Sequence, residues 1–355
     1  MHCSQPTANA GAEHTVQEIG VKLADFDYNL PEELIAQEPL PERDQSRLLV
    51  LNRSTGDIEH RRFTDIVHYI NSDDIVVMND TRVTAKRMIG KKPTGGSVEA
   101  LLIDRLGGGL WRAMVKPGRR VSVGTVIEFG KGTIRAEVVD RIDDGGRILK
   151  FDPENEVEIE NIAEVPLPPY IQQKLNDPER YQTIYSRYNG SAAAPTAGLH
   201  FTSKILEALK SKGVEIVFVT LHVGIATFRP VRVENILDHE MHSEKVVISE
   251  EAAQKINSCR GRVVCVGTTT ARALESASTA DLKVRQMNEE TRLFITPGYK
   301  FKIVDALLTN FHMPKSTLII MLSAFAGRDK VMKAYEEAVR ERYRFLSFGD
   351  AMFVY

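Results

Sequence analysis

Residues 263–276 read VVCVGTTTARALES, and this stretch decides the fold class. Its four apolar residues predict a short buried strand, the glycine makes a turn, and a helix begins among the three threonines. The same two kinds of element surround it: we expect helices at 203–212 and 250–257, and strands at 214–223 and 262–266. Helices that alternate with strands in this way indicate an α/β domain.

The N-terminal part mixes helices and strands as well. The expected elements are a helix start at 31–36, a buried strand at 48–52, a short helix capped by Thr64 at 64–70, and a buried strand at 74–80. This last strand ends beside Asp80 and Arg82. In open α/β sheets, the carboxyl ends of the strands form the edge where ligands bind.

The pattern changes between residues 88 and 151. Glycine-rich turns separate short β-like runs at 97–103, 110–115, 125–129, 135–139 and 147–151. Strands at this spacing indicate a small sandwich or barrel. We therefore predict an α/β main domain with an inserted small all-β barrel. The main domain comprises 21–87 and 152–355, the barrel 88–151, and a disordered extension 1–20.

The bulk composition narrows the class of protein. The 355 residues are 43% hydrophobic and 26% charged, with a formal net charge of −2. The three cysteines include no C-x-x-C pair, which argues against a disulfide framework or a structural zinc site and favours a reducing cytoplasm. No apolar run approaches the length of a membrane span. We expect a cytoplasmic protein that does not enter a membrane and is a monomer.

Four of the nine histidines lie between residues 191 and 244, namely His200, His222, His239 and His242. Histidine exchanges protons near neutral pH, so a cluster of them with Glu244 is typical of acid–base catalysis. For any one of these histidines we favour an ordinary core or surface role, but for the cluster as a whole we do not. His239 and His242 are three residues apart rather than the four of a zinc-binding helix, so we expect no metal.

Three further features could bind a ligand. The threonine-rich helix start at 268–270 could hold an anion, although threonine also caps ordinary helices. Near the C-terminus, Tyr299 and Phe311 could stack on a base that Asp305 and Asn310 read, although either ring could instead belong to the core. Two basic groups could contact phosphate. Their members are Lys86, Arg87, Lys91 and Lys92, then Arg119 and Arg120.

Several motifs resemble one family. The blocks NDTRVTAKR, PTAGLHF, HVGIATFRPV, HEMHSE, GTTTARALES and VDALLTNFHMPKSTLI occur in order. Together with others from Lys22 to Tyr355, they resemble the S-adenosylmethionine:tRNA ribosyltransferase-isomerases of queuosine biosynthesis. Two departures stand out: residues 1–20 have no counterpart, and Ala226 stands where the family usually carries glycine.

The resemblance implies a reaction. The ribosyl part of S-adenosylmethionine is transferred to the 7-aminomethyl-7-deazaguanine at the wobble position of tRNA and is isomerised, which gives epoxyqueuosine. Adenine and methionine leave. S-adenosylmethionine is then a consumed substrate rather than a cofactor, and no cofactor or metal is implied.

This chemistry suggests roles for the candidate residues. His200 or His242 would remove a proton from the carbon beside the sulfonium, and His222, His239 or Glu244 would protonate the departing adenine. The basic groups would contact tRNA phosphates. The candidate substrate-binding residues are Asp80, Arg82, Thr196, Gly198, Thr227, Arg229, Thr268, Thr269, Thr270, Arg272, Tyr299, Asp305, Asn310, Phe311 and His312.

Two other classes of protein compete with this interpretation. An S-adenosylmethionine methyltransferase would need a glycine-rich loop after the first strand of its sheet, and no such loop occurs. A tRNA-binding module without catalytic activity would explain the basic groups. It would not explain the histidines, which are distant from those groups in the sequence.

Overall fold

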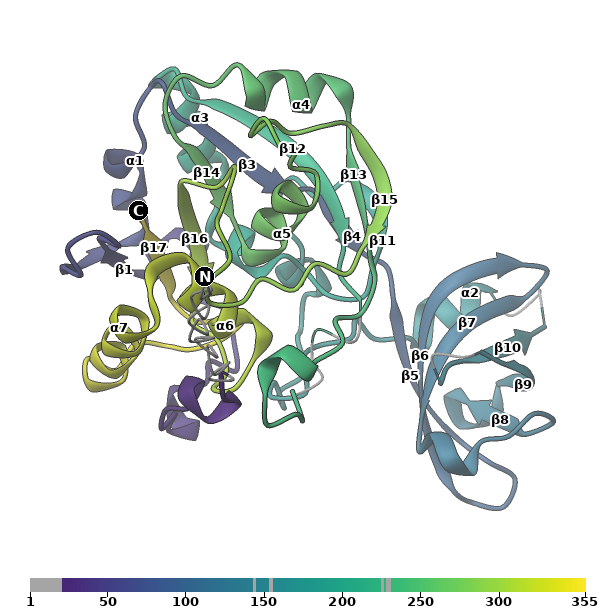
Figure 1. Ribbon diagram of the computed structural model, residues 1–355. Coiled ribbons are helices and arrows are strands. Elements are labelled where there is room, and N and C mark those ends of the chain that lie inside the picture. Colours follow the sequence, from purple (N-terminus) through teal and green to yellow (C-terminus); the bar gives the residue numbers. More distant parts are fainter. Residues whose placement is uncertain (1–20, 143–144, 153–155, 225–226, 228–230) are drawn as a thin grey trace, which may run out of the picture.

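The computed structural model describes residues 21–142, 145–152, 156–224, 227 and 231–355. In these residues it contains an α/β domain with a nine-stranded sheet and a separate closed β-barrel, which confirms the predicted fold class. Figure 1 shows the barrel to one side of the main sheet, and the chain enters it through β5 (Lys86–Lys91). No helix among the described residues is both long and apolar enough to span a bilayer.

The strands of the main sheet follow one another in an order far from that of the sequence. In space they are β15 (Met287–Thr291), β13 (Glu244–Ile248), β12 (Glu215–His222), β3 (Ile75–Asn79), β14 (Val263–Val266), β16 (Ala306–Asn310), β17 (Ala351–Val354), β1 (Arg47–Leu51) and β2 (Ile58–Arg62). The central strands β12, β3, β14 and β16 are parallel, so their carboxyl ends share one edge.

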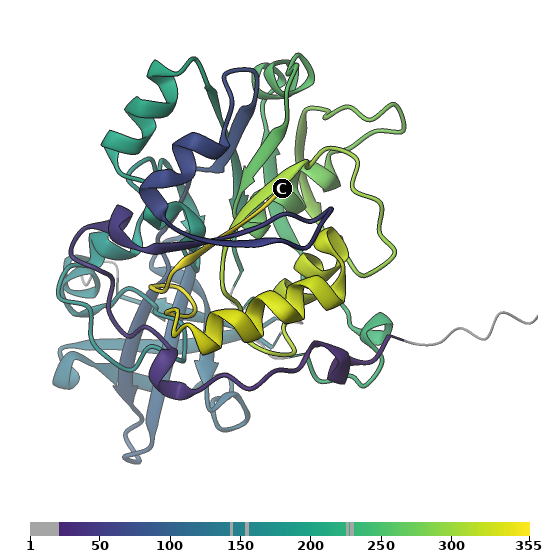
Figure 2. The same cartoon turned by 90° about the vertical axis from the view of Figure 1, so that its left-hand side faces the viewer.

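Helices cover both faces of this sheet. One face carries α4 (Glu250–Asn257), α5 (Thr268–Ser276), α6 (Thr317–Ala326) and α7 (Arg328–Arg340). The other carries α1 (Ile66–Tyr69) and α3 (Ser203–Ser211). Figure 2 views the sheet from the side of α7 and the β1–β2 hairpin. The resulting three-layer arrangement buries the central strands on both faces.

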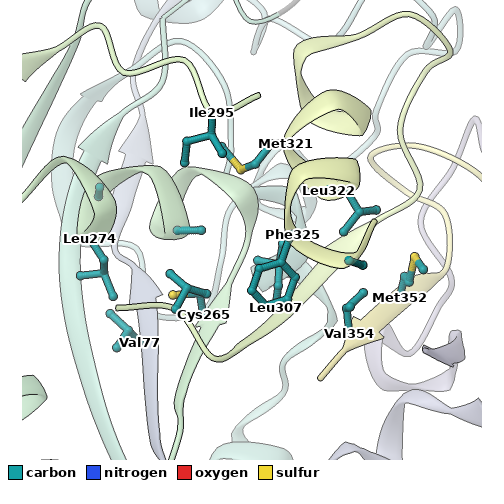
Figure 3. Close-up of a cluster of buried hydrophobic side chains, with 14 of the residues drawn as sticks. Val77, Cys265, Leu274, Ile295, Leu307, Met321, Leu322, Phe325, Met352 and Val354 are labelled. Carbon is teal, nitrogen blue, oxygen red and sulfur yellow. The ribbon is translucent and has the colours of Figure 1, made fainter. Parts of the chain in front are cut away.

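The core explains why the central strands contain apolar residues almost without interruption. Figure 3 shows Cys265 of β14 and Leu307 of β16 facing Leu274 of α5 and Phe325 of α6. On the opposite face, Val264 and Leu308 pack with residues of α3. Each strand therefore contributes alternate side chains to two separate cores.

The barrel has its own core. Its strands are β10 (Arg147–Phe151), β7 (Leu110–Lys116), β6 (Ser97–Gly107), β5 (Lys86–Lys91), β8 (Val126–Phe129) and β9 (Ile134–Arg141), all antiparallel to their neighbours. Helix α2 (Glu156–Ile162) packs Ile159 against this core. A short parallel pair, β4 (Thr81–Val83) and β11 (Tyr188–Ser191), lies beside the main sheet.

Most expected elements are present, with three corrections. The helix start expected at 31–36 is only a 3₁₀ turn at Glu32–Leu34, because the Ala36 N–H bonds Phe345 instead of continuing the helix. The helix expected at 64–70 is a 3₁₀ turn at Phe63–Asp65 followed by α1, and Thr64 does not cap it; the Asp65 carboxylate closes the turn by accepting from the Arg62 N–H at 3.0 Å. The third correction is β16, a central strand in a segment for which the sequence analysis names no element.

Candidate active site

The carboxyl edge of the central strands is held together by one buried amide. Asn79, at the end of β3, is fully buried. Its Nδ2 donates to the Leu221 carbonyl at 2.9 Å, and its Oδ1 accepts from the Leu221 N–H at 3.0 Å. The same oxygen accepts from the Thr81 N–H. Asn79 therefore aligns the ends of β3 and β12 beside the start of α5.

Helix α5 begins at this edge, directly after β14. Gly267 makes the turn with φ near +91°, a left-handed value that favours glycine. The first N–H groups of a helix lack intrahelical partners and lie at the positive end of the helix dipole, so this start can hold an anion. Of its threonines, Thr270 is fully buried and its hydroxyl donates to the Val266 carbonyl at 2.6 Å, which makes it unavailable to a ligand.

A cleft beside Thr268 and Thr269 holds about 690 Å³ of space, which includes open solvent at its mouth. One part of the wall is polar and the other apolar, which suits a ligand with both kinds of group. We call it the α5 pocket; its polar lining is Thr227, His239, His242, Glu244, Thr268, Thr269 and Arg272, and its apolar lining is Met241, Leu293, Phe294, Ile295, Leu318 and Met321 together with Thr317.

Glu244 and Arg272 form a buried ion pair in the wall of this pocket. The Glu244 Oε1 accepts from the Gly224 N–H at 3.0 Å and from the Thr227 hydroxyl at 3.1 Å, while Oε2 accepts from Arg272. Both carboxylate oxygens are thus occupied. The prediction that Glu244 exchanges protons therefore conflicts with its geometry, because this carboxylate already anchors the chain after β12.

Arg272 is equally committed to the protein. Its guanidinium donates to the carbonyls of Leu293 at 2.9 Å, His242 at 3.1 Å and Thr291 at 3.1 Å. Burial lowers the pKa of Arg272, and the nearby Glu244 carboxylate opposes this effect. The pair joins α5 to the segments before and after β13 and β15, so it shapes the pocket.

Two histidines stand at the pocket's opening. His239 is half-buried, and its ring lies 5.4 Å from the Phe294 ring, edge to face. Burial, and then the neighbouring His242, lower the pKa of His239 below 6.5, so its imidazole is neutral at physiological pH and can accept a proton. His242 is exposed, and its backbone is held by Arg272.

His200 lies in a different cavity. Its Nε2 faces the Asn310 Nδ2 at 3.2 Å, its Nδ1 faces the Ser46 hydroxyl at 2.8 Å, and its ring stacks on Phe63. Asn310 is itself fixed, since its Oδ1 accepts from the Thr196 hydroxyl at 2.9 Å. Burial lowers the pKa of His200 to about 4, so it stays neutral and is a weak base.

His222 lies on the opposite face of the sheet from Glu244. Its Nδ1 is 2.8 Å from the Thr81 hydroxyl, and its ring borders a broad groove shared with Asp80. Asp80 is buried and accepts from the Thr220 hydroxyl at 2.7 Å; burial raises its pKa. The predicted cluster is therefore divided: His239, His242 and Glu244 line one pocket, whereas His222 lies on the other face because side chains alternate between the faces of β12 and β13.

Several predicted substrate-binding residues serve the fold instead. Phe311 is fully buried among Tyr335, Tyr343 and Phe345, so it cannot stack on a base. The neighbouring His312 is buried, and burial lowers its pKa to about 3.

Two other predicted substrate-binding residues lie away from the carboxyl edge of the main sheet. Asp305 precedes β16 and accepts from the Val263 N–H at 2.9 Å, at the end opposite Asn310. The Tyr299 hydroxyl donates to Glu275 at 2.9 Å, near the C-terminus of α5.

Two more of the predicted substrate-binding residues are engaged in packing or in an ion pair. A Cβ at Gly198 would lie 2.0 Å from the Tyr185 hydroxyl, so this glycine permits close packing. Arg82 pairs with Glu179 and donates to the Ser186 hydroxyl at 2.9 Å. The predicted residues Arg229 and Ala226 lie outside the described residues.

The basic groups divide into paired and unpaired cations. Lys86 pairs with Glu160 of α2, and Arg87 pairs with Glu99 at 3.0 Å and Glu164 at 3.5 Å. These two are therefore largely neutralised. The other four are Lys91, Lys92, Arg119 and Arg120, which form no ion pair with any described residue; Lys92 Nζ donates to the Arg120 carbonyl at 3.2 Å. We call these four the barrel patch.

The apolar lining of the α5 pocket escaped the sequence analysis. Phe294 and Ile295 belong to the irregular segment after β15, and apolar residues in such a segment carry no chemical signal of their own. Arg43 and Arg180, which line the His200 cavity, were also missed because 136 intervening residues separate them.

Comparison with known proteins places this geometry in a family. Residues 23–354 match the family described as "Queuosine biosynthesis protein". The chain belongs to this family. Two relatives in it, from Acetivibrio thermocellus and Clostridioides difficile, are named S-adenosylmethionine:tRNA ribosyltransferase-isomerase. Each is 54% identical over 340 residues, which cover 94% of this chain and 100% of the relative.

A solved structure extends the comparison. The crystal structure of S-adenosylmethionine tRNA ribosyltransferase from Thermotoga maritima has 40% identity and a TM-score of 0.53. The match covers 93% of this chain and 100% of that one. The predicted resemblance to the queuosine biosynthesis family is thus confirmed across both the main domain and the barrel.

Proposed function

We propose that this protein transfers the ribosyl group of S-adenosylmethionine to the 7-aminomethyl-7-deazaguanine of a tRNA wobble position and isomerises it. The products are epoxyqueuosine in the tRNA, free adenine and free methionine. The observation that carries this function is the 54% identity to ribosyltransferase-isomerases over their whole length. S-adenosylmethionine is consumed as a substrate, and no cofactor is required.

We propose the α5 pocket as the S-adenosylmethionine site. The methionine carboxylate would bind at the start of α5. Thr268 and Thr269 offer hydroxyls there, and the first turn of the helix offers unpaired N–H groups. Phe294 and Met321 offer an apolar wall to the remainder of the molecule. The pocket's position at the carboxyl edge of the sheet, where ligands of α/β proteins bind, supports the same assignment.

His242 and His239 are the proposed acid–base pair. The sulfonium acidifies the neighbouring carbon, so a positioned imidazole can take its proton, and a second group can protonate adenine as its glycosidic bond breaks. These two histidines share the pocket opening, whereas His200 and His222 lie in other cavities. We expect His242→Gln and His239→Gln to lower kcat by 10²-fold or more. His68→Gln, an exposed histidine on α1, is the matched control.

The barrel patch is the proposed contact for tRNA phosphates. Lys91→Glu with Arg120→Glu should weaken tRNA binding and reduce its salt dependence, because fewer counterions are released. Lys131→Glu with Lys150→Glu, at two exposed barrel cations outside the patch, controls for net charge. Equal effects of the two changes on affinity would refute the patch. We propose that the protein acts as a monomer in the cytoplasm, where its tRNA substrate is found.

The decisive test measures the products from S-adenosylmethionine and tRNA carrying the deazaguanine precursor. Adenine that appears in step with a new tRNA nucleoside, and only with that tRNA, supports ribosyl transfer. S-adenosylhomocysteine would instead indicate a methyltransferase. Binding of tRNA without any product would leave the protein as a tRNA-binding module.

A further inference from the structure

The small cavity that contains His200 is lined by two arginines from distant parts of the chain. Its volume is about 310 Å³, and its lining includes Arg43, Arg180, Ser46 and Ser347. A third arginine, Arg344, lies close enough to affect His200 electrostatically. We call this the arginine pocket.

Each arginine is held in place by backbone carbonyls rather than by carboxylates. Arg43 donates to the carbonyls of Gln182 at 2.7 Å and Glu179 at 2.9 Å. Arg180 donates to the carbonyls of Pro41 at 3.0 Å and Leu40. Arg344 donates likewise to the Glu38 carbonyl. Carbonyl bonds fix the position of a guanidinium without pairing its charge with a carboxylate. The carboxylates of Asp177 and Glu179 act on Arg43, and those of Asp350 and Glu38 on Arg344, only through space.

The positive charge of this pocket has no acidic counterpart bonded to it. None of the three arginines forms an ion pair with a described residue. The nearby Glu179 carboxylate forms an ion pair with Arg82. The Asp350 carboxylate accepts from the backbone N–H groups of Arg47 and Arg344, not from a guanidinium.

Two donor atoms in the cluster are also unused. Arg180 Nε and Arg344 Nη1 are buried and have no hydrogen-bond partner among the described residues. A buried donor left unpaired costs about 1–3 kcal/mol, so such groups usually meet a partner in the working complex. Burial and then the facing Arg180 lower the pKa of Arg43, as expected for two cations turned toward one space.

We infer that the arginine pocket binds one oxyanion, and that this oxyanion is a backbone phosphate of the tRNA. Guanidiniums without a carboxylate partner match the acceptors of a phosphodiester. The two lining serines already have partners, since the Ser46 hydroxyl is bonded to His200 and the Ser347 hydroxyl to Tyr170. The space of about 310 Å³ includes open solvent at the mouth of the pocket, so the pocket suits a single group better than a whole S-adenosylmethionine. The identification of tRNA as the molecule that carries this phosphate rests on the proposed function.

The carboxylate of S-adenosylmethionine has the same chemistry and is the alternative source. The experiment therefore measures two kinds of binding rather than turnover. The first is the salt dependence of tRNA affinity, and the second is the Kd of S-adenosylmethionine; each is determined for the wild type, Arg180→Gln and Arg180→Lys. Arg147→Gln is the matched control, because Arg147 also donates to backbone carbonyls but lies inside the barrel.

One lost phosphate contact should reduce the slope of log K against log salt by about 0.7. We expect this reduction in Arg180→Gln, with partial recovery in Arg180→Lys and an unchanged Kd for S-adenosylmethionine. Inorganic phosphate should raise the melting temperature of the wild type above that in chloride at equal ionic strength, and this difference should vanish in Arg180→Gln.

Two outcomes would overturn the inference. A weaker affinity for S-adenosylmethionine with an unchanged salt slope would assign the pocket to the carboxylate. If Arg180→Gln lowered only the melting temperature, as Arg147→Gln does, Arg180 would stabilise the fold without binding phosphate. Failure of the proposed function would be seen separately, as absence of adenine release by the wild type.

Discussion

The buried Glu244–Arg272 pair gives a quantitative prediction for stability. In Glu244→Gln, the amide is nearly isosteric but leaves the buried Arg272 guanidinium without its counter-charge. Removal of one partner from such a pair costs about 3–5 kcal/mol, and the amide oxygen can still accept from Gly224, so we expect about 3 kcal/mol. At roughly 2 °C per kcal/mol for a large domain, the melting temperature falls by about 6 °C.

Urea unfolding with two spectroscopic probes would measure this loss. Glu336→Gln, the same change at an exposed position on α7, should stay within about 0.5 kcal/mol of the wild type. Arg272→Met should cost more than Glu244→Gln, because three backbone carbonyls also lose their donor. The double variant should cost about 2 kcal/mol less than the sum of the single ones. If Glu244→Gln matched Glu336→Gln, the pair would not stabilise the pocket.

Two further outcomes follow from buried contacts. Gly198→Ala places a Cβ 2.0 Å from the Tyr185 hydroxyl and should destabilise by about 1–3 kcal/mol in thermal unfolding, whereas Gly118→Ala, with open space around it, should not. The pKa of His200 is about 4 in the folded protein, against 6.5 for a free histidine. Between pH 6.5 and pH 4, His200 therefore binds a proton in the unfolded chain but not in the folded one. Stability should therefore fall by about 3 kcal/mol as pH drops from 6.5 to 4, and His200→Gln should remove this part of the acid dependence; an unchanged pH profile would contradict it.

Much of the fold was predictable because local pattern and tertiary environment agree. The stretch 263–276 is apolar where both sheet faces are covered, and it turns at a glycine where φ is positive. The barrel strand Lys86–Lys91 was not predictable, because its inward positions hold Met88 and Gly90 between charged residues. The helix start at 31–36 failed for a different reason, since a distant carbonyl at Phe345 captured the Ala36 N–H.

The sequence predicted the kinds of residue at the candidate site, but not which of them lie together in space. Thr268 and Thr269 could be assigned because a strand–glycine–helix sequence has one local geometry. The histidines could not be grouped, because the face on which His222 and Glu244 lie depends on strand pairing between residues 215 and 248. Phe311 and His312 follow a strand whose depth in the sheet depends on the C-terminal residues.

The order β16–β17–β1–β2 has a consequence for how the chain is made. In the described structure, the β1–β2 hairpin joins the sheet through β17, so that Leu48 pairs with the distant Ala351. During synthesis, residues 47–62 are made long before residues 351–354, and until then the hairpin has no neighbouring strand of this sheet to pair with. Pairing of β1 with β17 is therefore a long-range contact that forms late, and it limits how early this end of the sheet can assemble.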